Sequence, residues 1–280
     1  MYGDRIEGLR QSGARFIEIL QKERASNLSK SLLSEEDDQV WVSVLPYTAR
    51  VNLSRYPAFF DSPPPDETAA CPDPRYGDPG QDDSPLSLGL LPNVGSAGSR
   101  GSQTERLCPA AFAIGPTRSL EPVQRELRNL PLNPGCTRFD LGTIWGWRAV
   151  SPQWWSAWQG ADDSLPLPPE TSKKIVVILT DGYNTPSCAH DPGTRGDADA
   201  LFLAACEAMK DQGIRPYTIY FGEPLADLQD LLARCSEGTG QTYHAADNPA
   251  LMSVFEGIAR DVAELPLAAE GNVQEGQLRP

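Results

Sequence analysis

The sequence lacks the features of several common protein classes. It has no apolar run approaching the roughly 20 residues of a transmembrane helix; the longest aliphatic run, Ile175 to Leu179, has the length of a strand. We therefore expect no membrane span in this chain. Basic residues are in deficit, 24 against 38 acidic ones, which gives a formal net charge of −14. This balance argues against nucleic acid as a partner, because phosphate binding needs a basic surface.

Motifs for zinc binding and hydrolysis are also missing. The chain has two histidines, no CxxC pair, no HExxH and no GxSxG elbow. His190 and His244 are candidate general bases for a hydrolase, the less favoured alternative. His190 falls in a polar loop and His244 in an expected short strand, where solvated or packed side chains are the simpler interpretation. We therefore expect a protein that is not an enzyme.

The six cysteines are even in number and widely spaced. This pattern favours three disulfides and an oxidising compartment, periplasmic or extracellular. The alternative is six reduced, mostly buried thiols in a cytosolic protein.

What is present is an alternation of strand and helix patterns. Apolar spacing predicts a helix over 4–23, and β-branched residues predict a strand buried on both faces over 40–45, with 49–53 as an edge extension. A central strand from 174 runs into the turn at 180–182. The remaining expected elements are helices over 120–130, 140–150, 198–212, 225–235 and 249–262 and strands over 215–221 and 241–246.

This order predicts an α/β fold: an open, mostly parallel sheet with helices on both faces. One domain covers 1–265, and 266–280 reads as a flexible tail. Within the domain, 56–107 is rich in proline and, toward its end, in glycine and serine, and is expected to be an irregular insertion. The aromatic cluster Trp154, Trp155 and Trp158 is expected to cover the core beneath a loop rather than form an exposed patch.

Several segments resemble a known family. Leu179–Asn184 resembles the third loop of the metal-ion-dependent adhesion site of von Willebrand factor type A (VWA) domains, and Gly135–Gly142 resembles the second loop. Further segments are similar to TadG-type pilus-assembly proteins, namely Trp145–Pro152, Cys206–Lys210, Tyr217–Ile219, Leu232–Ser236 and Phe255–Ala259.

The resemblance implies a binding module of the cell envelope rather than an enzyme. Thr137 and Asp181 are the implied metal ligands, and their alternative is ordinary turn residues. Asp140 and Asp4 are weaker ligand candidates, with a helix cap as the simpler role for Asp4. Gly182 and Asn184 belong to the site loop. The implied cofactor is Mg²⁺, or Mn²⁺ or Ca²⁺, and the implied partner is another envelope or extracellular protein that supplies a carboxylate.

One family feature is missing. The first loop, Asp-x-Ser-x-Ser, does not occur, and residues 1–6 look like the sequence that follows it. The first strand is therefore expected to be missing, and an anchoring segment, if any, to lie upstream. We expect weak Mg²⁺ binding by the chain as given. A degenerate, purely structural VWA domain without metal dependence is the alternative function.

Cysteine pairing is expected as follows. The family comparison suggests Cys206–Cys235, since both residues fall in matched segments. The position of the insertion suggests Cys71–Cys108. Cys136–Cys188 is the remaining pair, and it would join the second and third site loops.

Overall fold

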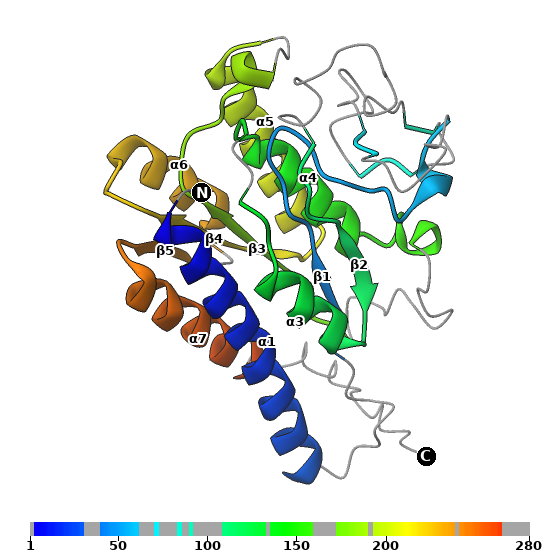
Figure 1. Cartoon of the computed structure of the whole chain (residues 1–280), viewed down its shortest axis with the longest axis vertical. Coiled ribbons are helices and arrows are strands. Elements are labelled where there is room, and N and C mark those ends of the chain that lie inside the picture. The colour runs from blue at the N-terminus through cyan, green and yellow to red at the C-terminus, as the bar shows by residue number, and fades with distance from the viewer. Residues whose placement is uncertain are drawn as a thin grey trace, which may run out of the picture.

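The computed structural model describes residues 3–30, 40–61, 70–72, 83–85, 90–91, 108–132, 135–158, 172–189, 193–238 and 241–264. The elements in chain order are α1 (Asp4–Lys30), β1 (Val42–Val44), η1 (Pro57–Phe59), β2 (Ile114–Thr117), α3 (Leu120–Arg128), α4 (Phe139–Val150), η3 (Trp155–Ala157), β3 (Ile175–Thr180), η4 (Pro186–Ala189), α5 (Arg195–Asp211), β4 (Arg215–Phe221), α6 (Ala226–Ser236), β5 (Thr242–Ala245) and α7 (Asn248–Glu264). Figure 1 shows their arrangement. His190, the expected tail and much of the expected insertion lie outside these ranges.

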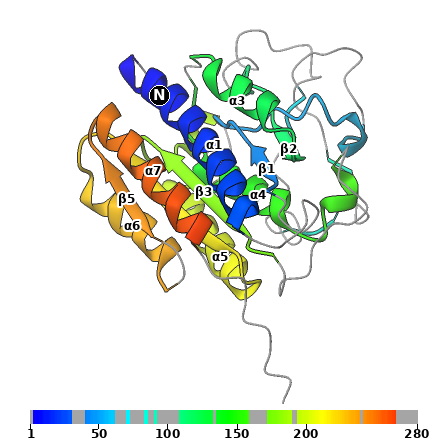
Figure 2. The same ribbon diagram turned by 90° about the horizontal axis from the view of Figure 1, so that it is seen from below.

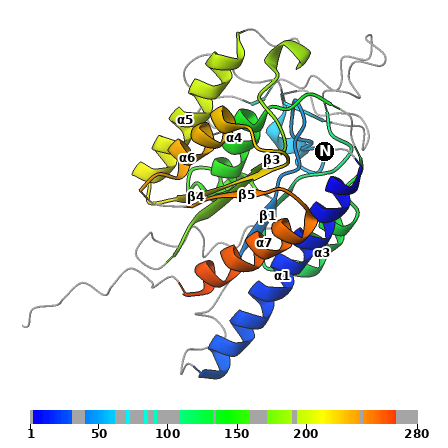
Figure 3. The ribbon, with the colours of Figure 1, turned by 90° about the vertical axis from the view of Figure 1, so that its left-hand side faces the viewer.

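The fold is mixed α/β and contains a parallel sheet. Three strands pair in the order β3-β4-β5, all parallel. Helices α4, α5 and α6 lie on one face of this sheet, and α1 and α7 lie on the other (Figure 3). The central strand β4 is buried on both faces, as a strand between two helix layers must be. The expected strand from 174 is present, but it lies at the edge of this sheet and pairs with β4 alone, so the expectation that it is the central strand was wrong.

The strand predicted over residues 40–45 differs from the expectation in its pairing. The segment 40–45 was expected to be a strand buried on both faces of the parallel sheet. Instead, β1 is half-buried throughout and pairs antiparallel with β2 in a separate two-stranded sheet. The segment 49–53 makes isolated bridges in place of an edge strand. The expectation was wrong because apolar β-branched composition reports strand tendency but not the partner of the strand.

Helix α5 shows why these boundaries fall where they do. The Thr194 hydroxyl accepts a hydrogen bond from the Asp197 backbone, and the Asp197 carboxylate accepts one from the Thr194 N–H, so both orphan donors are satisfied. After the last turn, Gly213 has φ of 73°, a conformation that a side chain disfavours. The Ile214 N–H then bonds back to the Met209 carbonyl at 2.9 Å. The helix therefore ends at its C-cap residue Gln212, and Gly213 turns the chain toward β4.

Two glycines let helix α4 lie close to the strands. A Cβ placed on Gly142 would be 2.7 Å from Cδ1 of Tyr47, and one on Gly146 would be 2.9 Å from Cγ1 of Val176. Both distances are shorter than real Cβ contacts. Both glycines, which are otherwise unfavourable inside a helix, are therefore required by packing.

The tryptophan cluster is buried beneath chain from the expected insertion. Trp154 is fully buried, and it packs with Phe59, Phe60, Ala70 and Leu91 in one apolar cluster. The ring of Phe59 makes edge contacts with Trp154 and Trp158. The expectation that these tryptophans cover the core beneath a loop is met.

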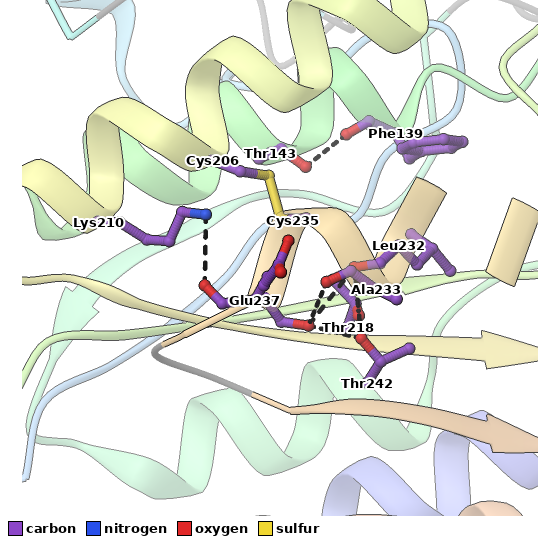
Figure 4. The surroundings of a disulfide bond; sticks show 11 residues. Phe139, Thr143, Cys206, Lys210, Thr218, Leu232, Ala233, Cys235, Glu237 and Thr242 are labelled. Atoms are coloured by element: carbon purple, nitrogen blue, oxygen red, sulfur yellow. Dashed lines mark hydrogen bonds between the residues drawn. A yellow bond between two sulfur atoms is a disulfide. The ribbon is translucent and has the colours of Figure 1, made fainter. Parts of the chain in front are cut away.

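Three disulfides are formed, Cys71–Cys108, Cys136–Cys188 and Cys206–Cys235, which are the pairs named from the sequence. Figure 4 shows the last of them joining α5 to α6 above β4. Beside it, the Thr218 hydroxyl of β4 donates to the Leu232 carbonyl at 3.1 Å, so α6 is held to the sheet as well as to its neighbour.

Candidate functional site

Two loops meet at the carboxyl end of β3. The Thr137 backbone N–H donates to the Thr185 hydroxyl oxygen at 2.8 Å, and the Thr185 N–H donates to the Thr137 carbonyl at 2.8 Å. The Cys136–Cys188 disulfide adds a covalent link one residue before Thr137 and three after Thr185. The two segments that the sequence assigned to one site, 48 residues apart, therefore lie side by side.

Asp181 follows β3 at this same edge and is half-buried. Its negative charge affects the pKa values of two tyrosine hydroxyls. Burial raises the pKa of Tyr47, and the negative charge of Asp181 adds to the shift. Burial likewise raises the pKa of Tyr220, at the end of β4, where Asp181 again contributes in the raising direction. The negative charge of Asp181 therefore acts on tyrosine hydroxyls from two segments that meet at this edge.

The loop after Asp181 is fixed by hydrogen bonds. The Thr180 hydroxyl donates to the Gly182 carbonyl at 2.9 Å. Asn184 is almost fully buried, and its amide nitrogen donates to the Asp199 carboxylate of α5 at 3.0 Å. The Asn184 side-chain oxygen accepts from the Asp140 N–H at 3.4 Å. Asn184 thus joins this loop to both α5 and the start of α4, so its role is to fix the position of the loop.

Asp140 has a different role from the one the resemblance implies for it. Its carboxylate is completely buried and accepts hydrogen bonds from the Arg138 guanidinium at 2.6 and 2.9 Å. Burial raises the pKa of Asp140, and the hydrogen bonds and charge of Arg138 oppose that shift. The Arg138 backbone N–H also donates to the Thr48 carbonyl at 2.9 Å. In this structure the carboxylate anchors the second loop through Arg138.

Asp4 is exposed and is the first residue of α1. Its carbonyl accepts from the Asn248 side chain at 3.1 Å, at the start of α7. The neighbouring Arg5 guanidinium lies near Gly222, just after β4. The beginning of α1 is therefore also at the carboxyl edge of the parallel sheet. The sequence suggested that Asp4 caps the helix from outside, whereas the structure has Asp4 as the first residue within it.

A polar network and a cavity flank the third loop. The Tyr183 hydroxyl donates to the Asp227 carboxylate, and the Arg195 guanidinium lies 4.4 Å from the centre of the Tyr183 ring. Arg195 also pairs with Asp227 at 3.4 Å. These residues border a cavity of about 440 Å³ between α5 and α6. The network ties the loop to both helices.

Sequence reasoning missed three residues of this site. Thr185 was not named, although it follows Asn184 in the same loop and supplies the hydroxyl that meets Thr137. Arg138 was not linked to Asp140, since burial of a charged pair leaves no pattern in the chain. Tyr47 donates to the Leu179 carbonyl at 2.7 Å from a segment 132 residues earlier, which no local pattern indicates.

Comparisons with known proteins add little to this geometry. No family model and no curated protein matches the chain. A solved pilus adhesin, SpaC from Lactobacillus rhamnosus GG, matches 93% of this chain at 12% identity and a TM-score of 0.47. Proximal thread matrix protein 1 from the mussel byssus matches 52% of it at 16% identity and a TM-score of 0.32. The matches span only 28% and 30% of those longer chains. At these values neither likeness carries an argument.

Proposed function

We propose that this chain is a VWA-like domain, most similar to TadG-type pilus-assembly proteins, that acts as a non-enzymatic protein-binding or adhesion module with a partial divalent-cation site. The observation that carries the proposal is the paired hydrogen bonding of Thr137 and Thr185, closed by the Cys136–Cys188 disulfide. It holds the second loop against the third at the edge where Asp181 follows β3. Such edges are where open α/β sheets bind ligands.

The donor set suits a hard cation but is small. The Thr137 hydroxyl and the Asp181 carboxylate are oxygen ligands of the kind Mg²⁺ prefers, and Mg²⁺ takes six at about 2.1 Å. Asp140 is engaged by Arg138. Within the described residues, no group of three or more His, Cys, Asp and Glu side chains could hold a metal. Water and a carboxylate of the partner would complete the shell, so we infer weak cation binding by the chain alone and tighter binding together with a partner.

The disulfides indicate where this module works. Three disulfides form and persist in an oxidising compartment, which supports a periplasmic or extracellular location. Among the helices of the described ranges, none has the length and apolar composition of a membrane span. The inferred partner is accordingly another envelope or extracellular protein.

Two other functions are less well supported. A hydrolase would need a base beside a nucleophile, but the His244 ring nitrogen lies 2.7 Å from the Gly222 carbonyl and the ring stacks on Tyr220. These contacts suit a packed histidine at the strand edge. A degenerate domain that never binds metal is the stronger alternative, favoured by the loss of Asp140 to its ion pair.

Manganese titration separates these possibilities. Mn²⁺ is added to the oxidised chain with and without acetate as the partner carboxylate, and binding is followed by water proton relaxation. We expect weak binding that tightens with acetate. Asp181→Asn should weaken it by at least about tenfold, or 1.4 kcal/mol. Asp211→Asn, which changes an exposed carboxylate at the last residue of α5, is the matched control and should leave binding unchanged.

Each result has a clear meaning. Tight stoichiometric binding without acetate would contradict the partial site, and unchanged binding by Asp181→Asn would contradict its location. Failure to bind Mn²⁺ in the presence of acetate would establish the degenerate alternative.

A further inference from the structure

The three disulfides differ in how far solvent reaches them. Five of the six cysteines are buried, namely Cys71, Cys108, Cys136, Cys206 and Cys235. Cys206 and Cys235 also lie inside the apolar core on one face of the parallel sheet. Cys188 is the exposed one. The Cys136–Cys188 bridge is therefore the one that combines a buried cysteine with a cysteine at the surface.

Cys136 is held in place by the body of the domain. It packs against Ala49. Two residues later, the buried Arg138 donates its backbone N–H to the Thr48 carbonyl at 2.9 Å. Helix α4 begins at Phe139 and packs against β3 and α5 (Figure 2). This side of the bridge is therefore fixed by contacts that do not involve the disulfide.

Cys188 lies on a short element at the surface. It belongs to η4, a turn of four residues, and its N–H donates to the Thr185 carbonyl at 3.2 Å. Ser187 beside it is also exposed. The hydrogen bonds of Thr137 with Thr185, three residues before Cys188, also join the two loops. Cys188 is therefore the end of the bridge that a reagent in solution reaches, and the end that gains freedom when the bridge opens.

Access decides which disulfide exchanges with an added thiol. The thiolate attacks one sulfur of the disulfide, so that sulfur must be reachable, and exposed disulfides are the labile ones. A thiolate that attacks Cys188 forms a new S–S bond there and breaks the bond to Cys136. Cys136 leaves as a thiolate and takes up the proton that the incoming thiol gave to water. No electrons are gained or lost overall, so the incoming thiol is the only reagent.

We propose that the Cys136–Cys188 bridge is a thiol-exchange site, at which a cysteine thiol of a partner protein attacks Cys188 and forms a mixed disulfide with it. The partner is accordingly a protein with an accessible free thiol. Exchange captures it covalently beside the edge that carries Thr137 and Asp181. Cys136 is released as a free thiol inside the fixed second loop, from which it can attack the mixed disulfide and release the partner again.

Exchange also has a consequence for the candidate cation site. The open bridge leaves the second and third loops joined by hydrogen bonds of Thr137 with Thr185 and of Asp140 with Asn184. The loops are then less restricted, so we expect cation binding to weaken. This consequence rests on the proposed function. The exchange itself does not, because the thiol reaction needs no bound cation.

A short peptide tests the exchange site. The probe is Ala-Cys-Ala, capped at both ends, which represents the cysteine of a partner and carries no charge of its own. The folded, oxidised chain is incubated with it at neutral pH, free thiols are trapped with N-ethylmaleimide, and the products are mapped by mass spectrometry without reduction. We expect the peptide on Cys188, the trapping reagent on Cys136, and reaction at the other two bridges at least about tenfold slower. The peptide with serine in place of cysteine is the control and should not attach.

Charge beside the attacked sulfur gives a second readout. Ser187→Lys should attract the incoming thiolate and speed attachment by about twofold, and Ser187→Asp should slow it by about twofold. The same two changes at Ser253, an exposed position of α7, are the matched controls and should leave the rate unchanged. Equal or faster reaction at another bridge, attachment to Cys136, or no attachment to the folded chain would overturn the proposal. Identical rates for the two Ser187 variants would show that attack does not occur at Cys188.

The consequence for the cation site is measured separately. Manganese titration in the presence of acetate is repeated on the double variant Cys136→Ala with Cys188→Ala, which we expect to bind at least about threefold more weakly than the oxidised chain. Unchanged binding would show that the loops are ordered without the bridge. No manganese binding by the oxidised chain would contradict the proposed function alone, since the mapped position of the peptide decides the exchange site.

Discussion

The two halves of this domain are stabilised in different ways. The parallel half consists of β3, β4 and β5 with α5, α6 and α7, and its core is largely aliphatic and ordered by strand register. The aromatic half consists of β1, β2, α3, residues 47–61 and Trp154–Trp158. Both of its strands are short, and β1 is half-buried whereas β2 is mostly buried. Stacked rings and the Cys71–Cys108 disulfide support it in place of an extended sheet. Regular pairing defines one half, and side-chain packing defines the other.

The largest expected effect compares one phenylalanine from each half. Phe221 ends β4 and Phe59 lies among the tryptophans, and both are fully buried. Replacing either by alanine should cost about 3–5 kcal/mol of unfolding free energy at its own site. We expect Phe221→Ala to lower the stability of the whole domain, and Phe59→Ala to promote opening of the aromatic half alone. Amide exchange distinguishes the two, and uniform loss of protection in both variants would mean that the halves unfold as one unit.

The buried ion pair beside the rim gives the next effect. Arg138→Met leaves the Asp140 carboxylate buried without its cation, which should cost about 3–5 kcal/mol at neutral pH. Burial already raises the pKa of Asp140, so its contribution favours folding below the ordinary carboxyl pKa and is lost as pH rises through the folded value. Without Arg138 the pKa should rise further, and the loss should shrink on acidification.

Urea unfolding at neutral and acidic pH measures this effect. The double variant Arg138→Met with Asp140→Leu is the control and should recover most of the stability. An equal loss at both pH values would show that packing, rather than charge, dominates at this site.

Removing disulfides sharpens the comparison further. Replacing Cys71 and Cys108 by alanine should cost about 2–4 kcal/mol by freeing the unfolded chain. Near-UV circular dichroism should fall as the tryptophan cluster loosens, while far-UV signal is retained. The same change at Cys206 and Cys235 should instead lower the urea midpoint of the parallel half. Loss of far-UV signal in the first variant would show that the parallel half depends on the aromatic one.

The smallest effect concerns helix glycines and should differ in sign. Gly146→Ala forces a Cβ against Val176 and should cost about 1–3 kcal/mol. Gly257→Ala, in α7, meets nothing within 4 Å and should stabilise the helix by up to about 1 kcal/mol. Thermal unfolding measures both. Stabilisation by Gly146→Ala would show that α4 can move away from the strands.

The sequence predicted the parallel half better than the aromatic half, for a physical reason. Residues Ile175 to Leu179 of β3 form a continuous aliphatic run, and α5 has a threonine cap and a glycine after its last turn, which are local patterns. Strand β2 was not predicted because Gly115 and Pro116 are typical of turns. Its glycine is required by a contact: a Cβ there would lie 2.4 Å from Trp158. Nothing near Gly115 in the chain indicates that distant ring.

The candidate site divides in the same way. The two loops that carry Thr137 and Asp181 were expected to lie together because both resemble loops of one family site, and Asp181 was also expected at a ligand-binding edge because it follows a strand of a parallel sheet. The contacts that hold those loops were not predicted. Thr185, Arg138 and Tyr47 act through partners that depend on burial and on tertiary geometry, and residue type alone does not report either.

The bridge between Cys136 and Cys188 has a thermodynamic consequence for any ligand of this edge. Ordering a flexible surface on association costs roughly 0.5–1.5 kcal/mol for each side chain that must be immobilised. Here a covalent bond across 52 residues restricts those conformations as soon as the thiols are oxidised. A ligand therefore binds to loops that are already ordered, and less of its binding free energy is lost to ordering them.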